Sequence, residues 1–263
     1  MNRLHEKIKK HEVAFGTHIS LNDSTITELI GNVGFDYLWI DMEHTAINLD
    51  TLQLHLIAAR AAGVSAIVRI PWNDFIYAKP VLEMGPQGIV FPHINTYNEA
   101  IKVVQACSYP PKGIRGFGPR RAIQYGKISI EEYLSKIDDE LLKIIQIEDI
   151  EAVKNLDHIL TIEDIDVFIL GPCDLASSLG KIGQWQDPKV LNTIKTVFKK
   201  IKEAGKTVGV SYGAASYEEI LGWNKLGADM ISIAADTDLL FLGAKGLLKK
   251  MKKAFGIISE KKV

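Results

Sequence analysis

The chain has few of the features that mark secreted, membrane-spanning or metal-clustered proteins. It contains two cysteines, Cys107 and Cys173, with no CxxC pair and no Cys/His spacing of a zinc site. This argues against a disulfide scaffold and favours a reduced, intracellular protein. No stretch approaches the ~18 apolar residues of a membrane span. The polar amino terminus, MNRLHEKIKKHE, lacks the apolar core of a secretion signal. We therefore expect a cytoplasmic protein with no membrane partner.

An excess of either charge is also absent. Lys and Arg total 31 against 32 for Asp and Glu, a formal net charge of -1. Such a balance leaves no overall electrostatic footprint for nucleic acid. With 263 residues, 47% of them apolar, the chain can form one large α/β domain, although length alone would also allow two small ones. Because no linker or break in composition divides the sequence, we expect a single domain over residues 1–263.

Short apolar runs alternate with longer amphipathic segments along the whole chain. Eight strands alternating with about eight helices are typical of a (β/α)8 TIM barrel. A doubly wound open sheet is the second interpretation, but no GxGxxG follows the first strand. The sequence therefore predicts an α/β barrel. The predicted strands cover residues 13–17, 37–41, 66–69, 88–91, 143–147, 167–170, 208–211 and 230–233.

Three segments depart from this simple alternation. A helix over 75–84 is expected to break near Pro80, and the Gly- and Pro-rich segment 109–125 predicts a long loop. The carboxyl-terminal segment, KGLLKKMKKAFGIISEKKV, spaces its apolar residues as a helix does. We expect a final barrel helix with a solvated lysine face. The same pattern also suits a helix that lies on a membrane surface, on nucleic acid or on another subunit.

Ionisable residues follow the second predicted strand, in the run FDYLWIDMEHT at 35–45. Asp41 and Glu43 are two residues apart and share one side of an extended chain, and His44 follows in the loop. The carboxyl ends of barrel strands surround the active site. A carboxylate holding one nitrogen of His44 would leave the other free as a base. An ordinary turn with acidic capping residues would contain the same residues.

Arg69 ends the third strand, and the turn Gly171, Pro172, Cys173 and Asp174 follows the sixth. A guanidinium at a strand end costs too much to bury unpaired, so it forms a structural ion pair or receives an anion. The backbone N–H groups of the 171–174 turn could bind a second anionic oxygen. Together they predict a small anionic 2-oxo acid as the ligand.

Glu148 and Asp174 follow the neighbouring fifth and sixth strands. Two converging carboxylates repel unless a proton or a cation lies between them. Oxygen donors without a cysteine pair suit a hard cation, Mg²⁺ or Mn²⁺, and Gln146 could bind one of its waters. Alternatively, Glu148 only caps the helix that begins at once.

Lysine is absent from the predicted strand ends, since Lys143 and Lys206 lie at strand starts. A Schiff-base mechanism needs a lysine in the pocket. The sequence therefore favours enolisation assisted by a metal and Arg69, with His44 moving a proton directly or through water.

Five motifs in order resemble the HpcH/HpaI aldolase family of the phosphoenolpyruvate-binding barrel superfamily. They are IDMEH at 40–44, VRIPWND at 68–74, PPKGIRGFG at 110–118, QIE at 146–148 and GPCDL at 171–175. The resemblance implies a divalent-metal class II aldolase acting on pyruvate or a related 2-oxo acid. It implies metal ligation by Glu148 and Asp174, substrate contact by Arg69, and proton transfer by His44 oriented by Asp41. It also implies that amides around Cys173 and Asp174 hold the substrate carboxylate.

The resemblance further implies a homo-oligomer, commonly a hexamer, in which the last helix is exchanged between subunits. One branch of the family consists of citrate synthases from siderophore gene clusters, which condense acetyl-CoA with oxaloacetate. In that alternative, the basic loop would receive the CoA phosphates. A non-catalytic protein that binds a 2-oxo acid is a third reading. The basic residues of the loop are Lys112, Arg115, Arg120 and Arg121.

Overall fold

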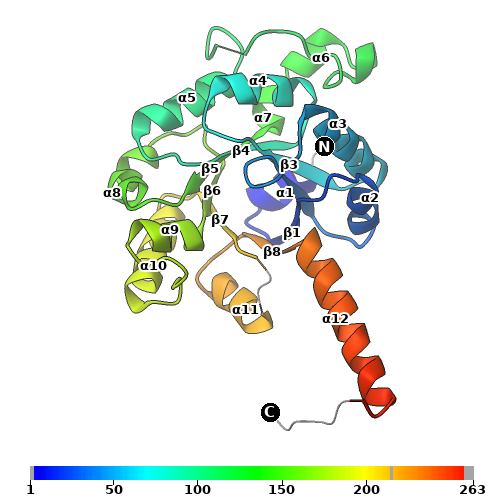
Figure 1. The fold of residues 1–263 in the computed structure, drawn as a ribbon. Helices are drawn as coiled ribbons and strands as arrows, with labels where there is room; N and C mark the ends of the chain where they lie inside the picture. Colours follow the sequence, from blue (N-terminus) through cyan, green and yellow to red (C-terminus); the bar gives the residue numbers. More distant parts are fainter. Residues whose placement is uncertain (1–2, 214–215, 258–263) are drawn as a thin grey trace.

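A computed structural model describes residues 3–213 and 216–257. Its centre is a closed barrel of parallel strands that pair in chain order, β1 to β8, with β8 returning to β1. Figure 1 shows the ring of strands with helices outside it. The predicted (β/α)8 barrel is confirmed. The strands are β1 (Ala14–Ile19), β2 (Tyr37–Asp41), β3 (Ser65–Arg69), β4 (Gly88–Phe91), β5 (Leu142–Ile147), β6 (Val167–Leu170), β7 (Thr207–Ser211) and β8 (Met230–Ala235).

Helices follow the strands and cover the outside of the barrel. They are α1 (Arg3–Lys9), α2 (Thr25–Gly31), α3 (Leu49–Ala61), α4 (Phe75–Glu83), α5 (Tyr97–Cys107), the 3₁₀ turn η1 (Gln124–Gly126), α6 (Ile130–Leu134), α7 (Ile137–Glu140), α8 (Ile150–Ile159), α9 (Pro172–Ser178), α10 (Pro188–Glu203), α11 (Tyr217–Lys225) and α12 (Asp236–Ala254). No helix in 3–213 or 216–257 is long and apolar enough to cross a bilayer.

The core has two parts because a strand of a barrel buries both of its faces. Large apolar side chains of one parity, such as Tyr37, Trp39, Ile67 and Ile144, fill the inside of the barrel. Those of the other parity pack against the surrounding helices. The short α1, which the sequence did not predict, contributes buried Leu4 and Ile8 to the inner cluster. It therefore plugs the barrel at the amino ends of the strands, and it lies within the ring of strands in Figure 1.

The predicted break of the helix near Pro80 is wrong. Pro80 lies inside α4, which runs without interruption from Phe75 to Glu83. Proline costs a helix one backbone hydrogen bond. Here α4 buries Ala78, Val81 and Leu82 against the barrel, and this packing outweighs the missing bond.

The predicted loop over 109–125 is irregular, as expected, but it lies away from the ends of the strands that carry the site. It connects α5 to β5, so it belongs to the amino ends of the strands, and Ala122 donates its N–H to Glu83 at the end of α4. Arg115 is buried and donates to Tyr133 Oη at 2.6 Å, and Lys112 pairs with Asp164 at 2.5 Å. The loop therefore does not form one basic patch beside its own catalytic pocket, contrary to the expectation for CoA.

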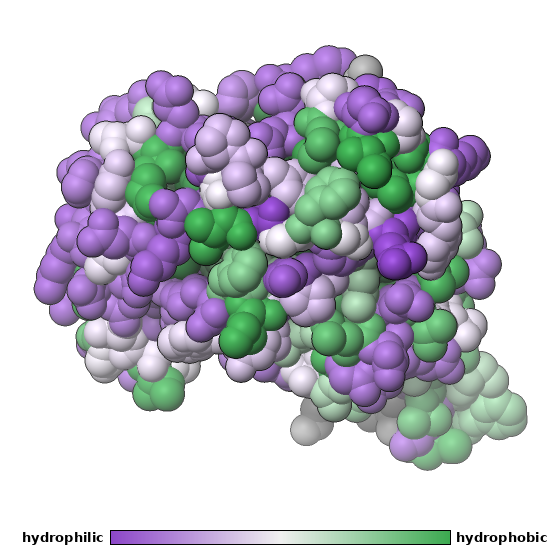
Figure 2. Space-filling model, turned by 90° about the horizontal axis from the view of Figure 1, so that it is seen from above, coloured by the Kyte–Doolittle hydropathy of each residue, from purple (hydrophilic) through white to green (hydrophobic). Residues whose placement is uncertain are grey.

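The expected packing of the last helix on its own barrel is also wrong. Among the residues of α12, only Asp236 is buried. The rest of the helix projects from the barrel in Figure 1, and its hydrophobic side chains protrude at the lower right of Figure 2. Phe241, Leu247 and Phe255 are 63–75% exposed. Both faces of the helix, and not only its lysines, meet solvent.

Candidate active site

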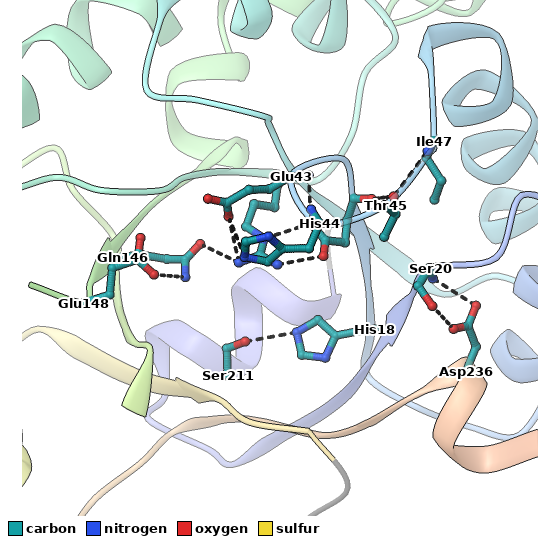
Figure 3. A network of polar contacts seen from close by, with 12 residues as sticks. His18, Ser20, Glu43, His44, Thr45, Ile47, Gln146, Glu148, Ser211 and Asp236 are labelled. Carbon is teal, nitrogen blue, oxygen red and sulfur yellow. Dashed lines mark hydrogen bonds and ion pairs between the residues drawn. The ribbon is translucent and has the colours of Figure 1, made fainter. Parts of the chain in front are cut away.

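The alternation of side chains along the strands builds a polar layer above the apolar interior of the barrel. Asp41 follows Trp39 by two residues, Arg69 follows Ile67, and Gln146 follows Ile144, so each points inward as the apolar residue before it does. Figure 3 shows the outcome: Glu43 and His44 face Gln146 and Glu148 across one space, and His18 and Ser211 face each other nearby.

Arg69 is the hub of this layer and is 6% exposed. Its Nε and Nη2 donate to the two oxygens of Asp41 at 2.9 and 2.7 Å, a two-pronged ion pair. Its Nη1 lies 2.8 Å from Glu43 Oε2 and donates to Gln146 Oε1 at 3.4 Å. The guanidinium also lies 5.5 Å from the centre of the Trp39 ring. These contacts fix the orientation of the guanidinium before any substrate arrives.

The charges of Arg69 and Asp41 stabilise each other. Burial alone would lower the pKa of Arg69, but the hydrogen bonds and charges of Asp41 and Glu43 outweigh it and raise that pKa. Likewise, burial would raise the pKa of Asp41, and the bonds from Arg69 overcome this and lower it. Both groups are therefore ionised at neutral pH.

Glu148 is held at the opposite side of the layer. It is 3% exposed; its Oε1 accepts the backbone N–H of His93 at 2.7 Å, and its Oε2 accepts from Gln146 Nε2 at 2.8 Å. Burial raises the pKa of Glu148 to about 7, and the charges of Glu43 and Asp174 add to the shift. Since Gln146 also contacts Arg69, it links the two charged groups of the site.

His93, which the sequence does not distinguish from other residues that follow a strand, bridges two acidic residues. Its Nε2 lies 3.5 Å from Glu43 Oε1, and its Nδ1 lies 3.4 Å from Glu148 Oε1. The backbone of His93 has a φ of 52°, and Asn73 donates to its carbonyl at 2.7 Å. For Glu43, too, the sequence shows only a position after a strand. Such a position does not reveal which side chains Glu43 and His93 contact.

His44 lies at the rim, with 62% of its side chain exposed, and its Nε2 is 3.8 Å from Glu43 Oε2. Asp41 was expected to orient the ring of His44. Its carboxylate instead holds Arg69 and accepts the backbone N–H groups of Glu43 and His44, at 3.0 and 3.5 Å. Asp41 thus fixes the loop that carries His44, while the nearest acidic group to the ring is Glu43.

Gly171, Pro172, Cys173 and Asp174 form the start of α9 beside Glu148. Gly171 and Pro172 are buried, whereas Cys173 and Asp174 are exposed. A Cβ on Gly171 would lie 3.0 Å from Glu148 Oε2 and 3.6 Å from Asp174 Oδ2. Both carboxylates therefore converge on the space that the glycine leaves open.

This cradle fits a hard divalent cation. Within 3–213 and 216–257, no three or more His, Cys, Asp and Glu side chains gather as a metal cluster. Two carboxylates suffice for Mg²⁺, however, which keeps several waters and takes substrate oxygens as further ligands. The raised pKa of Glu148 shows an electrostatic cost that a cation would relieve.

A second polar pair, His18 and Ser211, lies beside the Trp39 ring. His18 Nδ1 is 3.3 Å from the Ala234 carbonyl, so this nitrogen carries the proton, and Nε2 then accepts from Ser211 Oγ at 3.0 Å. The ring centres of His18 and Trp39 are 5.1 Å apart. Burial and the charge of Arg69 lower the pKa of His18 to about 4. His18 is therefore a neutral hydrogen-bonding group at the pocket.

Comparison with known proteins assigns the chain to one family. The family model HpcH/HpaI aldolase/citrate lyase matches residues 14–249. The chain belongs to this family. The HpcH/HpaI barrel and the enzyme class, an aldolase-type lyase, are thus as predicted, and aldolases of this family generally depend on a divalent metal.

Two curated HpcH/HpaI relatives match nearly the whole chain. A 4-hydroxy-2-oxo-heptane-1,7-dioate aldolase of Shigella sonnei is 35% identical over 94% of this chain and 93% of its own. A hydroxypyruvate/pyruvate aldolase of Roseobacter denitrificans is 31% identical over 96% of this chain and 98% of its own.

Solved structures of the HpcH/HpaI family also resemble this chain. A family protein from Burkholderia cenocepacia superposes with a TM-score of 0.89 at 27% identity, covering 96% of this chain and 100% of its own. The citrate synthase SbnG superposes with a TM-score of 0.86 at 26% identity, covering 97% of this chain and 100% of its own.

Proposed function

We propose that the protein is a divalent-metal-dependent aldolase that cleaves 4-hydroxy-2-oxo acids into pyruvate and an aldehyde. The observation that carries this proposal is the prearranged Arg69, clamped by Asp41 and Glu43 beside the carboxylate cradle of Glu148 and Asp174. The names of the two aldolase relatives support the substrate class.

Arg69 binds the 2-oxo acid through an N–H group that its contacts within the protein do not use. A guanidinium has five N–H groups. Two go to Asp41 and one to Gln146, and Nη1 also forms an ion pair with Glu43, so among the described residues the second N–H on Nη2 has no protein partner. We assign it to the 2-oxo oxygen, where negative charge develops as the C3–C4 bond breaks. Because its position is fixed by the ion pairs, little reorganisation is needed during the reaction.

Glu148 and Asp174 would hold Mg²⁺ or Mn²⁺, with Gln146 Nε2 orienting the Glu148 carboxylate. When bound, the metal supplies Lewis-acid stabilisation of the enolate. The backbone N–H groups of Cys173 and Asp174 lie in the first turn of α9, where they lack helical partners, and would bind the substrate carboxylate. Lysine takes no part in the bond-breaking step.

His44 moves the proton. In cleavage, the 4-hydroxyl gives its proton to His44 directly or through water, the C3–C4 bond breaks, and its electrons pass to the enolate. A proton returned to C3 then completes pyruvate. The exposed position of the His44 ring, 3.8 Å from Glu43, suits a group that exchanges protons with solvent and is stabilised when it becomes charged.

Condensation of acetyl-CoA with oxaloacetate, giving citrate, is the second candidate. The similarity to the citrate synthase SbnG favours it. In that reaction oxaloacetate would take the 2-oxo-acid site. The loop that was expected to bind the CoA phosphates lies at the amino ends of the strands, which weakens the case for this reaction within one chain.

A paired assay tests the two reactions on one EDTA-stripped preparation, with and without Mg²⁺ or Mn²⁺. One arm measures pyruvate released from 4-hydroxy-2-oxo acids, and the other measures free thiol from acetyl-CoA plus oxaloacetate. We expect metal-dependent pyruvate release without thiol. Thiol release with citrate formed would overturn the aldolase assignment. Binding of the oxo acid without turnover in either arm would mark a non-catalytic binding protein.

We also propose a homo-oligomer, with a hexamer as the family's common form, in which α12 is exchanged between subunits. The exposure of the helix supports it. The two unpaired cysteines, Cys107 and Cys173, support a reducing, cytoplasmic setting, and the balanced net charge of -1 speaks against a nucleic-acid partner.

A further inference from the structure

A cavity of about 430 Å³ lies between the end of α3 and the segment 121–141. Its walls include Gly85 and Gln87, which precede β4, and Leu141, which precedes β5. It therefore lies at the amino ends of the strands, whereas the Arg69 layer lies at their carboxyl ends. Its size is within the range of small-molecule sites. Nothing in the aldolase reaction uses it.

Two guanidinium groups line this cavity, those of Arg60 from α3 and Arg121 from the loop before η1. Arg60 Nη2 donates to Gln124 Oε1 at 2.7 Å, and Arg121 Nη1 donates to the carbonyl of Met84. Within the described part of the chain, neither forms an ion pair with a carboxylate. Both are instead anchored by neutral oxygens, which orient the groups but leave their charge uncompensated.

The two like charges act on each other. Arg121 is half-buried; burial lowers its pKa, and the charge of Arg60 lowers it further. Glu132 and Glu140 also line the cavity, but Glu132 pairs with Lys136 at 2.8 Å, and among the described residues neither carboxylate forms an ion pair with Arg60 or Arg121. An anion between the two guanidinium groups would remove the repulsion.

The remaining wall is apolar. Leu56 and Leu141 are 3% exposed and Tyr133 is 7% exposed, and all three line the same cavity together with Ile128 and Ile137. The cavity thus combines a doubly cationic edge with a hydrophobic floor, the arrangement that suits an anion carrying an apolar body.

We propose that this cavity is a binding site for a small phosphomonoester. Its phosphate lies between Arg60 and Arg121, and its apolar portion lies against Leu56 and Leu141. Arginine is preferred over lysine for such a group because its planar donors match phosphate oxygens in pairs.

Isothermal titration calorimetry on the full chain tests the site, in buffer without phosphate and with pyruvate present in excess at the Arg69 site. Phenyl phosphate and inorganic phosphate are the two probes. We expect phenyl phosphate to bind one per chain and more tightly than inorganic phosphate, because only the former reaches the apolar floor. No heat from either probe at millimolar concentration would overturn the proposal, as would tighter binding of phenyl phosphate when pyruvate is left out.

Arg60→Gln and Arg121→Gln should each weaken phenyl phosphate binding at least tenfold, with cleavage activity unchanged. Arg120→Gln is the matched control, because Arg120 is the exposed sequence neighbour that does not line the cavity, and it should change the Kd less than twofold. An equal loss in Arg120→Gln would reveal unspecific attraction and overturn the site.

Gln124→Glu separates binding from folding. It places a carboxylate where Arg60 already finds an oxygen at 2.7 Å, so the protein itself would neutralise the guanidinium. Gln124 has a φ of 54°, a backbone conformation that glutamate and glutamine tolerate equally. We expect binding to fall at least tenfold while the melting temperature is unchanged or higher. Unchanged binding in this variant would contradict the proposed place of the phosphate.

Discussion

Glu148 is a buried carboxylate beside other acidic groups, and burial with those charges raises its pKa to about 7. If it binds the metal, Glu148→Gln removes one of two anionic ligands. We expect Mn²⁺ affinity, measured by calorimetry, to fall by at least about tenfold, with pyruvate release falling in parallel. Gln can still accept the His93 N–H that Glu148 Oε1 accepts at 2.7 Å, so the fold should be kept.

Exposed Glu163→Gln is the control for this experiment, because it removes the same charge from the surface far from the cradle. It should bind Mn²⁺ as the wild-type chain does. Wild-type metal affinity in Glu148→Gln would remove Glu148 from the ligand set.

His18 provides a pH-dependent contribution to stability. Burial lowers its pKa to about 4, from 6.5 in the unfolded chain. Above pH 6.5 both states leave it neutral. As the pH falls toward 4, only the unfolded chain takes up the proton, so the free energy of unfolding decreases. The loss reaches roughly 2 kcal/mol at pH 5 and at most about 3 kcal/mol at pH 4.

Urea unfolding at pH 7.5 and pH 5 measures this effect. The stability difference between wild type and His18→Gln should shrink by roughly 2 kcal/mol at the lower pH, since glutamine does not titrate. His11→Asn, at an exposed histidine, should leave the pH dependence as it is in the wild type. If His18→Gln and wild type lose equal stability, His18 is not held neutral by the fold.

The inward direction of the site residues follows from the sequence, but their pairing does not. Asp41, Arg69, Gln146 and Glu148 all come at or directly after apolar strands, so the period of two is enough to aim them into the barrel. Which carboxylate takes Arg69 depends on the register between β2 and β3, which sets Asp41 opposite Arg69. No single run of sequence contains that register.

The first turn of α12 is joined to the β1–α2 loop by one carboxylate. Asp236 is fully buried; its Oδ2 accepts the N–H groups of Ser20 and Leu21, each at 2.9 Å, and its Oδ1 accepts that of Thr237 and the Ser20 hydroxyl. Asp236→Ala would leave these donors without an acceptor. We expect it to lower the free energy of unfolding in urea by about 3 kcal/mol.

Asp238→Ala is the matched comparison in the same turn. Among the described residues, Asp238 accepts only the Ala235 N–H, at 3.1 Å, as part of the helix cap, so its loss should cost about 1 kcal/mol. Equal effects of the two substitutions would show that Asp236 acts as an ordinary cap and does not join the loop to the helix.

Strands with clear flanking residues were predictable, and the short helices α1, α6 and α7 were not. The strands 37–41, 88–91 and 167–170 have the predicted bounds, because Gly, Pro or charged residues flank each apolar run. The helices α1, α6 and α7 have four to seven residues, too few to show a helical period. α1 buries Leu4 inside the barrel and α6 buries Tyr133 beside Arg115, and such tertiary packing is not visible in local sequence.

The barrel closes without α12, and this shapes how the whole protein is expected to assemble. The helix has 19 residues and so extends about 28 Å. Phe241, Leu248, Met251 and Phe255 recur at helical spacing along it and are 46–75% exposed. An apolar stripe of this length is typical of an interaction surface and supports the proposed contact between subunits. The lysines between these residues lie beside the stripe.

Leu248→Glu combined with Met251→Glu tests that assembly. Two carboxylates in the stripe would have to be buried without partners, which costs more than a subunit contact of this kind supplies. We expect the wild-type chain to elute as an oligomer in size-exclusion chromatography with light scattering, and the double variant as a smaller species. Lys249→Glu combined with Lys252→Glu adds the same two carboxylates at exposed lysines and should keep the wild-type mass. A monomeric wild type would contradict the proposal, because the stripe would then face water in the working enzyme.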